Sequence, residues 1–554
     1  MTQQQGNRYD AIVVGGGHNG LVAAALLAKR GARTVVLEKR HKTGGAADTS
    51  EPWPDEYPGV KVNTLSYTMS LMPPSLRREL QLERFGFKLL PLGQGYMPMR
   101  GGGSIIQADD DQKTRDSIAK LSKRDADAYF EFYEWISRIS DILGPMLMET
   151  PPHVGSKKPG DLWDLGKLAW KLRAHVDEAT VGDVTRLFTM SATDLLDRWF
   201  VTPEMKGFMA VNGIIGTWAG PDAPGTAYVL MHHSVGDIGD GQVAAWGFME
   251  GGMGAVSKAC EDSAKFFGAE VRVNAPVRTI ATSNGRVTGV VLDDGEEIAA
   301  PLVVTAVHPK ITFLQQLDRS ELPSSFVHDI EHWKTRSGTV KVNLAIDRLP
   351  TFTADPDFDP EIHGGAIELL DDVGQLEQAY QQARSGVAAA RPFSDTEIPT
   401  VVDTTLAPEG IHTVSMFTQW CPADWADDED DHTAELEGYA DRLIDHMDEV
   451  APGFRDSVLA RQIIGPKQMQ EGWDLIGGNI FHGELTVDQL FHMRPAVGYA
   501  DYRTPIAGLY QASSATHAGG GVTGLPGHHC VREIVADRRV EKSRLRSRRR
   551  SSTP

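Results

Sequence analysis

Residues 9–38 read YDAIVVGGGHNGLVAAALLAKRGARTVVLE, and this stretch decides the fold. The apolar run YDAIVV is followed by a glycine turn, the alanine-rich segment LVAAALLAKRG and a second apolar run, ARTVVLE. Short apolar runs rich in β-branched residues are typical of buried parallel strands, and the segment between them is suited to a helix. The stretch therefore predicts a complete βαβ unit.

The glycine turn carries Gly15-x-Gly17-x-x-Gly20 between the first strand and the helix, which is the spacing of a dinucleotide-binding motif. Gly15 permits the tight turn, Gly17 lets backbone N–H groups approach a diphosphate, and Gly20 allows close helix–strand packing. The diphosphate is expected on the helix N-terminus, where free N–H groups and the helix dipole favour an anion. His18 lies inside this loop and is expected to serve through its backbone.

Glu38 ends the second strand and is placed to accept hydrogen bonds from the adenosine ribose hydroxyls. The motif alone does not separate FAD from NAD. Three further features favour FAD: a second glycine turn at 44–45, an antiparallel meander expected over 271–306, and the turn HAGGG at 517–521, which directs a second helix N-terminus at an electron-rich group.

Composition and charge exclude several classes of protein. The 554 residues are 41% apolar and 23% charged, which is typical of a folded globular chain, and the net charge of −20 disfavours nucleic acid as a partner. Three widely separated cysteines provide neither a redox dithiol nor a zinc site, and we expect no metal. This cysteine usage, with no signal or membrane-spanning segment in view, predicts a cytoplasmic protein.

Five segments carry a resemblance to a known family: GGGHNGLVAAALLA, LEKRHKTGGAA, GGMGAVSKA, GGNIFHGELTVDQLF with the Arg494-Pro495 that follows it, and GLYQASSATHAGGGVTG. Together they resemble the phytoene-desaturase-like carotenoid/retinoid oxidoreductases, and within these the pyridine nucleotide-disulfide oxidoreductase domain-containing protein 2 group. The resemblance implies FAD, an α/β (α+β overall) fold with a glutathione-reductase-type FAD-binding Rossmann-like domain, and a discontinuous second domain for a hydrophobic substrate.

Motif and resemblance together assign cofactor binding to one set of residues. These residues are Gly15, Gly17, His18, Asn19, Gly20, Glu38, Lys39, Gly44, Gly45, Ala46, Val277, Thr516, Gly520, Gly521 and Val522.

Changes in composition along the chain predict its division into domains. We expect a flexible N-terminus at 1–8, an FAD-binding domain built from 9–75, 245–320 and 480–537, a substrate domain built from 76–244 and 321–479, and a basic disordered tail at 538–554.

Two residues are candidates for catalysis. His517 precedes the flavin-directed turn and is suited either to proton transfer near the ring or to bracing the turn. Arg494 is suited to closing over the cofactor or to pairing with a carboxylate. Hydride transfer to a flavin needs geometry and a dry pocket more than a strong base, so the lack of a catalytic triad does not exclude an enzyme.

The leading hypothesis is an FAD-dependent oxidoreductase that oxidises or desaturates an isoprenoid-like or other lipid substrate by hydride transfer. No second βαβ unit for a nicotinamide cofactor is visible, so oxygen, a quinone or a protein is the expected electron acceptor. Two alternatives stay open: an amine-oxidase-like flavoenzyme, and a flavin-binding interaction protein with little turnover. The sequence predicts no oligomeric state.

An apolar stripe runs through a predicted helix at 161–176, with two tryptophans and several basic residues beside it. We expect this helix to pack on the core. The alternative is a peripheral membrane contact, which a lipid-soluble substrate would make useful.

Overall fold

The computed structural model describes residues 8–551 apart from 70–71, 94, 154, 174 and 235–245, and it leaves out the side chains of 145, 164 and 541–551. The predicted flexible N-terminus at 1–8 thus lies outside the described residues except for Arg8.

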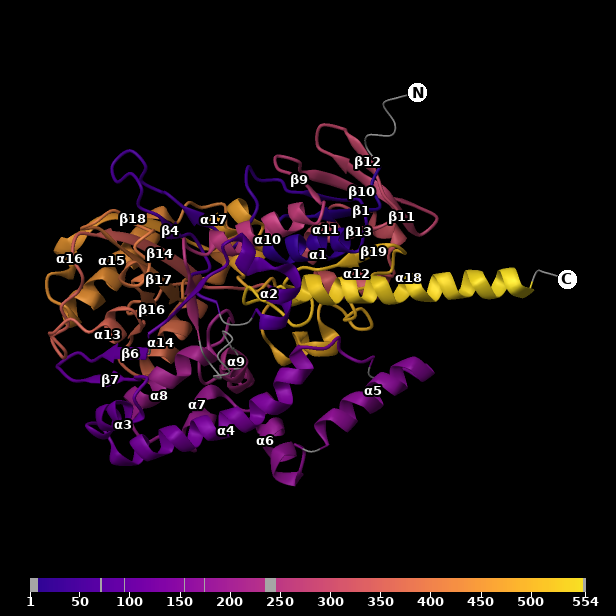
Figure 1. Ribbon diagram of the computed structural model, residues 1–554. Helices are drawn as coiled ribbons and strands as arrows, with labels where there is room; N and C mark the ends of the chain where they lie inside the picture. The colour runs from indigo at the N-terminus through magenta and orange to yellow at the C-terminus, as the bar shows by residue number, and fades with distance from the viewer. Residues whose placement is uncertain are drawn as a thin grey trace.

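A five-stranded parallel sheet in the order β19-β13-β1-β2-β9 carries the dinucleotide motif (Figure 1). Its strands are Ala11–Val14 (β1), Thr34–Leu37 (β2), Glu270–Arg272 (β9), Val303–Thr305 (β13) and Leu509–Gln511 (β19). Every residue of β1, β2 and β13 is buried, as both faces of the sheet are covered. The sheet draws on three distant chain segments, and its parallel order confirms the predicted Rossmann-like fold.

Helices cover one face of this sheet and a small sheet covers the other. The helices are α1 (His18–Lys29), α10 (Gly254–Phe266) and α18 (Leu525–Ser551), with α1 packed between the other two. The opposite face carries the antiparallel meander β10 (Val277–Ser283), β11 (Arg286–Leu292) and β12 (Glu297–Ala299). Side chains alternate between the two cores along each central strand, because successive strand residues point to opposite faces.

A seven-stranded sheet in the order β18-β14-β17-β16-β15-β6-β7 forms the second lobe (Figure 1). Its neighbours are antiparallel except for the parallel pair β15–β6. Its strands are Gly95–Pro98 (β6), Ser104–Ile106 (β7), Thr339–Ile346 (β14), Ala366–Leu369 (β15), Phe393–Glu397 (β16), His412–Gln419 (β17) and Val458–Ile464 (β18).

The remaining strands form two short pairs, and further helices complete both lobes. Their bounds are Thr49–Ser50 (β3), Val62–Asn63 (β4), Leu89–Pro91 (β5), Gly247–Met249 (β8), Pro74–Leu80 (α2), Asp111–Ala119 (α3), Lys123–Leu147 (α4), Pro159–Leu172 (α5), Glu178–Thr189 (α6), Ala192–Leu196 (α7), Pro203–Ala210 (α8), Thr226–His233 (α9), Pro309–Leu314 (α11), Ser324–Glu331 (α12), Pro360–His363 (α13), Val373–Arg384 (α14), Thr433–Val450 (α15), Phe454–Ser457 (α16) and Pro466–Trp473 (α17).

The predicted domain boundaries stay predictions, although the two large sheets divide the chain along similar lines. The parallel sheet takes its strands from within 9–75, 245–320 and 480–537. The seven-stranded sheet takes its strands from within 76–244 and 321–479.

Two expectations about helices differ from the structure. The C-terminal segment expected to be disordered continues α18 as far as Ser551, which is consistent with the lack of glycine and proline after Gly527 in that helix. The helix expected to pack on the core, α5, instead exposes its side chains: Trp163 is 68% exposed and Trp170 is 65% exposed. Among the described residues, no helix has the length and apolar character needed to cross a bilayer.

Candidate active site

One cavity of about 1170 Å³ is lined by residues of both lobes. Its lining includes the loops that follow β1 and β2, the start of β10, the loop before α18, and side chains of β14, β15, β16 and β17. Ligands of open parallel sheets bind at the carboxyl ends of the strands. The carboxyl ends of β1 and β2, at Val14 and Leu37, line this cavity.

The glycine loop after β1 opens into the cavity at the N-terminus of α1. Gly17 caps this helix without a side-chain hydrogen bond, and the first turn carries no acidic residue. A Cβ on Gly17 would meet no protein atom within 4 Å, whereas a Cβ on Gly20 would lie 2.1 Å from the carbonyl oxygen of Gly15. Gly20 is therefore required by packing, and Gly17 is free on the side from which an anion would approach.

Two buried polar atoms beside this loop have no partner within the described protein. They are Nε2 of His18 and Oδ1 of Asn19, and both residues line the cavity. Burial lowers the pKa of His18 to about 4, so its ring is neutral at pH 7. Unsatisfied buried polar atoms next to an uncapped helix N-terminus fit a polar, anionic ligand such as the diphosphate of a dinucleotide.

Glu38 lines the cavity and also braces the glycine loop. Its Oε2 accepts a hydrogen bond from the Gly16 N–H at 2.7 Å, and its Oε1 accepts from the Arg40 N–H at 2.9 Å. Further lone pairs on both oxygens could serve ribose hydroxyls, and that role stays a prediction. The neighbouring Lys39 forms an ion pair at 2.6 Å with Asp474, so it links the two lobes at the cavity wall.

The second glycine turn and the meander also reach the cavity. Gly44, Gly45 and Ala46 line it, and a Cβ on Gly45 would lie 3.3 Å from the Cα of Gly17. Val277 lines the cavity as well, and its carbonyl oxygen accepts a hydrogen bond from Gln316 Nε2 at 2.9 Å.

Only part of the predicted flavin-directed turn lines the cavity. Gly521 and Val522 are among the described residues that line the cavity, whereas Thr516 and Gly520 are not. The Thr516 hydroxyl donates to the Ser513 carbonyl oxygen at 2.8 Å, within its own turn. A Cβ on Gly520 would lie 2.0 Å from the ring of Phe481, so Gly520 is needed for packing.

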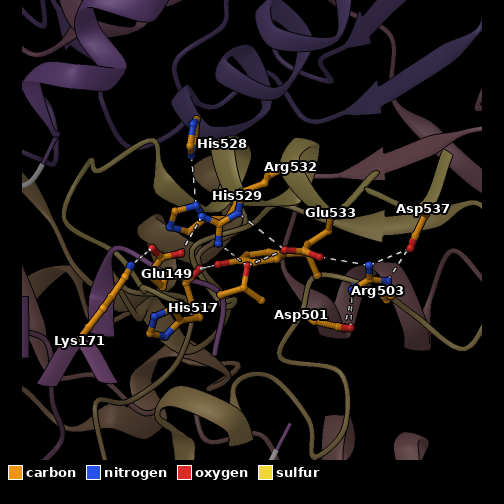
Figure 2. A network of polar contacts seen from close by, with 12 residues as sticks. Glu149, Lys171, Asp501, Arg503, His517, His528, His529, Arg532, Glu533 and Asp537 are labelled. Atoms are coloured by element: carbon orange, nitrogen blue, oxygen red, sulfur yellow. Dashed lines mark hydrogen bonds and ion pairs between the residues drawn. The ribbon is translucent and has the colours of Figure 1, made fainter. Parts of the chain in front are cut away.

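His517 is not among the described residues that line the cavity, and Figure 2 shows it at the edge of a polar network that includes Glu149 and Arg532. Its Nε2–H donates to the Met146 carbonyl oxygen at 3.0 Å, and its own carbonyl oxygen accepts from the Tyr502 hydroxyl at 2.7 Å. Burial lowers the pKa of His517 to about 4. Of the two predicted roles, these contacts favour bracing the turn.

Arg494 is 1% exposed. Its hydrogen-bond partners are backbone carbonyl oxygens, whereas the sequence suggested a carboxylate or the cofactor. Its guanidinium donates to the carbonyl oxygens of Phe481 at 2.8 Å, Ser514 at 2.9 Å and Gln489 at 3.2 Å. Burial lowers its pKa to about 10. Arg494 therefore ties the loop at 481–489 to the turn that precedes α18.

The sequence reasoning missed a group of ionisable side chains on the cavity face of the seven-stranded sheet. This group, the carboxyl cluster, consists of Glu368, Asp395, Glu397, Lys341 and Tyr67. A signal was present, because Lys341 interrupts the apolar run VKVNLAI and two acids alternate in the strand FSDTE. Their meeting depends on a strand order that no local pattern gives.

The other side of the cavity is aromatic and apolar. Its wall is built from Tyr129, Phe130, Tyr133, Phe208, Met209, Ile215 and Trp246. The cavity thus contains an anion-binding helix N-terminus, an apolar wall and the carboxyl cluster.

Among the described residues, no group of three or more His, Cys, Asp or Glu side chains could hold a metal ion. All three cysteines are free and buried.

Comparison with known proteins places this geometry among flavoproteins. Residues 13–80 match the model of an NAD(P)-binding Rossmann-like domain, and residues 183–447 match that of flavin containing amine oxidoreductases. The chain is 36% identical to pyridine nucleotide-disulfide oxidoreductase domain-containing protein 2 of Rattus norvegicus, covering 96% of this chain and 94% of the relative. It is 23% identical to a lycopene-forming phytoene desaturase of Pseudescherichia vulneris, covering 93% of this chain and 96% of that protein.

Among solved structures, cyclohexylamine oxidase from Brevibacterium oxydans shares the fold. The TM-score is 0.57 at 16% identity, and the alignment covers 96% of this chain and 99% of the oxidase.

Proposed function

This chain belongs to the pyridine nucleotide-disulfide oxidoreductase domain-containing protein 2 family of flavin-containing oxidoreductases, and from that premise we propose that it oxidises or desaturates a largely hydrophobic substrate. The single observation that carries the proposal is the continuous cavity, which joins the N-terminus of α1 to an aromatic wall in the other lobe.

The cofactor is FAD, and the residues at the glycine loop fit it. The uncapped N-terminus of α1 would hold the diphosphate through the N–H groups that follow Gly17. The turn that includes Gly521 and Val522 would lie near the flavin end of the cofactor. FAD, when bound, supplies the acceptor for a hydride from a substrate C–H bond.

The chain's own contribution is to position the substrate and to exclude water. Aromatic side chains from α4 and α8 and the residue Trp246 form an apolar wall that would hold a hydrocarbon skeleton against the ring. Such a transfer needs alignment more than a strong base. The neutral, buried His517 is therefore assigned to holding the turn.

An electron acceptor other than a nicotinamide cofactor completes the proposal. In the part of the chain that the structure describes, one parallel sheet carries one strand–turn–helix dinucleotide motif. Oxygen, a quinone or a protein is therefore the proposed acceptor.

A second candidate, oxidation of an amine, is favoured by one specific observation. The carboxyl cluster lines the same cavity, and carboxyl groups are the usual partners of a substrate ammonium. The match of residues 183–447 to the amine oxidoreductase model supports the same candidate.

Anaerobic reduction of the FAD-loaded protein tests the two candidates. We expect a polyene-containing lipid extract to bleach the flavin band, with rates within the roughly 1–1000 per second of typical enzymes. Bleaching by amines alone would favour the second candidate. If neither extract nor amine reduces the flavin, the proposal of an oxidase or desaturase is wrong and a flavin-binding interaction protein becomes the better hypothesis.

A further inference from the structure

The carboxyl cluster forms a row across four neighbouring strands. In the register of the sheet, Glu368 pairs with Asp395, Asp395 pairs with Phe417, and Phe417 pairs with Lys341. Directly paired residues of antiparallel strands share a face, so these side chains all lie on the side that lines the cavity. Glu397, two residues after Asp395, lies on the same face.

Contacts within the protein satisfy only part of this cluster. The Tyr67 hydroxyl donates to Oδ2 of Asp395 at 2.7 Å, and its ring stacks on Phe417 with centroids 5.8 Å apart. The ammonium of Lys341 donates to Ser415 and lies 4.5 Å from the centroid of the Tyr67 ring. Among the described residues, no carboxylate lies within ion-pair distance of Lys341.

Three carboxyl oxygens in the row have no donor from the described protein. They are Oε2 of Glu368, Oδ1 of Asp395 and Oε2 of Glu397. Asp395 is 9% exposed and Glu397 is 1% exposed, and both line the cavity. A buried carboxyl oxygen without a donor is costly, so these atoms indicate a group that arrives with the ligand.

We propose that the carboxyl cluster binds an ammonium group of the substrate, whose apolar body lies along the aromatic wall. Three carboxyl groups outnumber the single amine of Lys341, which leaves the cluster able to accept a positive charge. A purely hydrocarbon substrate would leave the three carboxyl oxygens named above without a donor. The inference rests on the proposed function only in taking the cavity as the substrate chamber.

Protonation provides an independent signature. Burial, together with repulsion from Asp395, raises the pKa of Glu368 and Glu397 well above the usual range. Burial also lowers the pKa of Lys341 to about 7 and raises that of Tyr67 well above its usual range. A bound ammonium favours the ionised carboxylates, so its binding should release protons and tighten as the pH rises.

Calorimetric binding of two matched probes to the FAD-loaded protein tests the proposal without turnover. Octylamine and octanol share the same eight-carbon chain, but the first carries an ammonium group and the second a hydroxyl group. We expect octylamine to bind at least tenfold tighter than octanol and to release protons, and we expect Asp395→Asn and Glu397→Gln to remove that difference. The variant Lys341→Met, which removes a competing cation, should tighten octylamine binding.

Several results would overturn the proposal. Equal affinity of the two probes for the wild-type protein would do so, as would octylamine binding that survives both carboxyl substitutions or weakens in Lys341→Met. Flavin content and the thermal midpoint report whether each variant is folded. Because no step requires oxidation of the probe, the result is separate from failure of the anaerobic reduction experiment.

Discussion

Arg494 and His517 hold backbone segments next to the cavity without lining it. Both were candidates for catalysis: His517 because it precedes the flavin-directed turn, and Arg494 because it could close over the cofactor or pair with a carboxylate. Arg494 donates to carbonyl oxygens of three segments, and His517 joins the turn to the end of α4. A sequence gives a residue's place along the chain, whereas these contacts depend on which loops meet.

The buried ring of His517 makes stability depend on pH. Its pKa is about 4 in the folded protein and near 6.5 when unfolded, so the unfolded state binds more protons between these values. The folded protein therefore has its full stability with respect to His517 above about pH 6.5. As the pH falls toward 4, the free energy of unfolding decreases by up to about 1.4 kcal/mol per pH unit. We expect His517→Gln, which keeps a donor for Met146 but does not titrate, to lose less stability than the wild type on acidification.

Thermal midpoints of both proteins at about pH 7.5 and about pH 5 measure the effect. The exposed His328→Gln is a matched control, in which the pH dependence should follow the wild type. A difference between His517→Gln and the wild type that is the same at both pH values would contradict the buried neutral ring.

At the scale of elements, two glycines at the N-terminus of α1 have different roles. Gly20 is required for packing, and Gly17 is expected to contact the diphosphate. Gly17 has φ −67°, which any residue adopts, and a Cβ there would meet no protein atom within 4 Å. We expect Gly17→Ala to fold with an unchanged thermal midpoint but to lose most of its FAD, because the methyl group would occupy the approach of the diphosphate.

The companion variant Gly20→Ala should behave differently. Its Cβ would lie 2.1 Å from the Gly15 carbonyl oxygen, so the loop and α1 must move apart, and we expect stability to fall by about 3 kcal/mol, the upper end of the usual cost of overpacking. Flavin content and thermal midpoint of both variants check the pair. Full FAD occupancy in Gly17→Ala would show that the diphosphate lies elsewhere.

The helix α5 is the element that sequence periodicity described least well. The apolar stripe predicts burial, yet two of its members, Leu162 and Leu165, are 53% and 39% exposed, and the tryptophans beside it are exposed as well. Figure 2 shows the polar network that holds its C-terminal part, in which Lys171 contacts Glu149 at 2.8 Å and Glu149 contacts Arg532 of α18 at 3.0 Å. Periodicity indicates which face is apolar but not what covers it.

We expect α5 to make the peripheral membrane contact that the sequence left open. Exposed tryptophans flanked by lysines suit the interface of an anionic bilayer. Sedimentation with vesicles of phosphatidylcholine and phosphatidylglycerol should carry the protein down at low salt, and Trp163→Ser should reduce binding roughly tenfold, or about 1.4 kcal/mol. Phe358→Ser, at a residue that is 61% exposed, is the control. No sedimentation of the wild type would contradict the expectation.

At the scale of the whole molecule, the elements of the dinucleotide-binding lobe could be predicted from local sequence signals. The carboxyl cluster of the other lobe could not, because it depends on how distant strands pair. The βαβ unit and the meander were readable, because glycine turns and apolar runs are local signals. The carboxyl cluster was not readable, because it needs β14 to pair with β17, the far end of the consecutive run β15, β16 and β17. Lys341, Glu368 and the pair Asp395 and Glu397 come from three different strands and meet only in the assembled sheet.

The most direct test of the central claim is the identity and amount of the cofactor in the purified protein. We expect a yellow protein whose denatured extract contains FAD at about one equivalent per chain, because the α1 N-terminus holds the diphosphate. A correctly folded, colourless protein that takes up no FAD on reconstitution would contradict it.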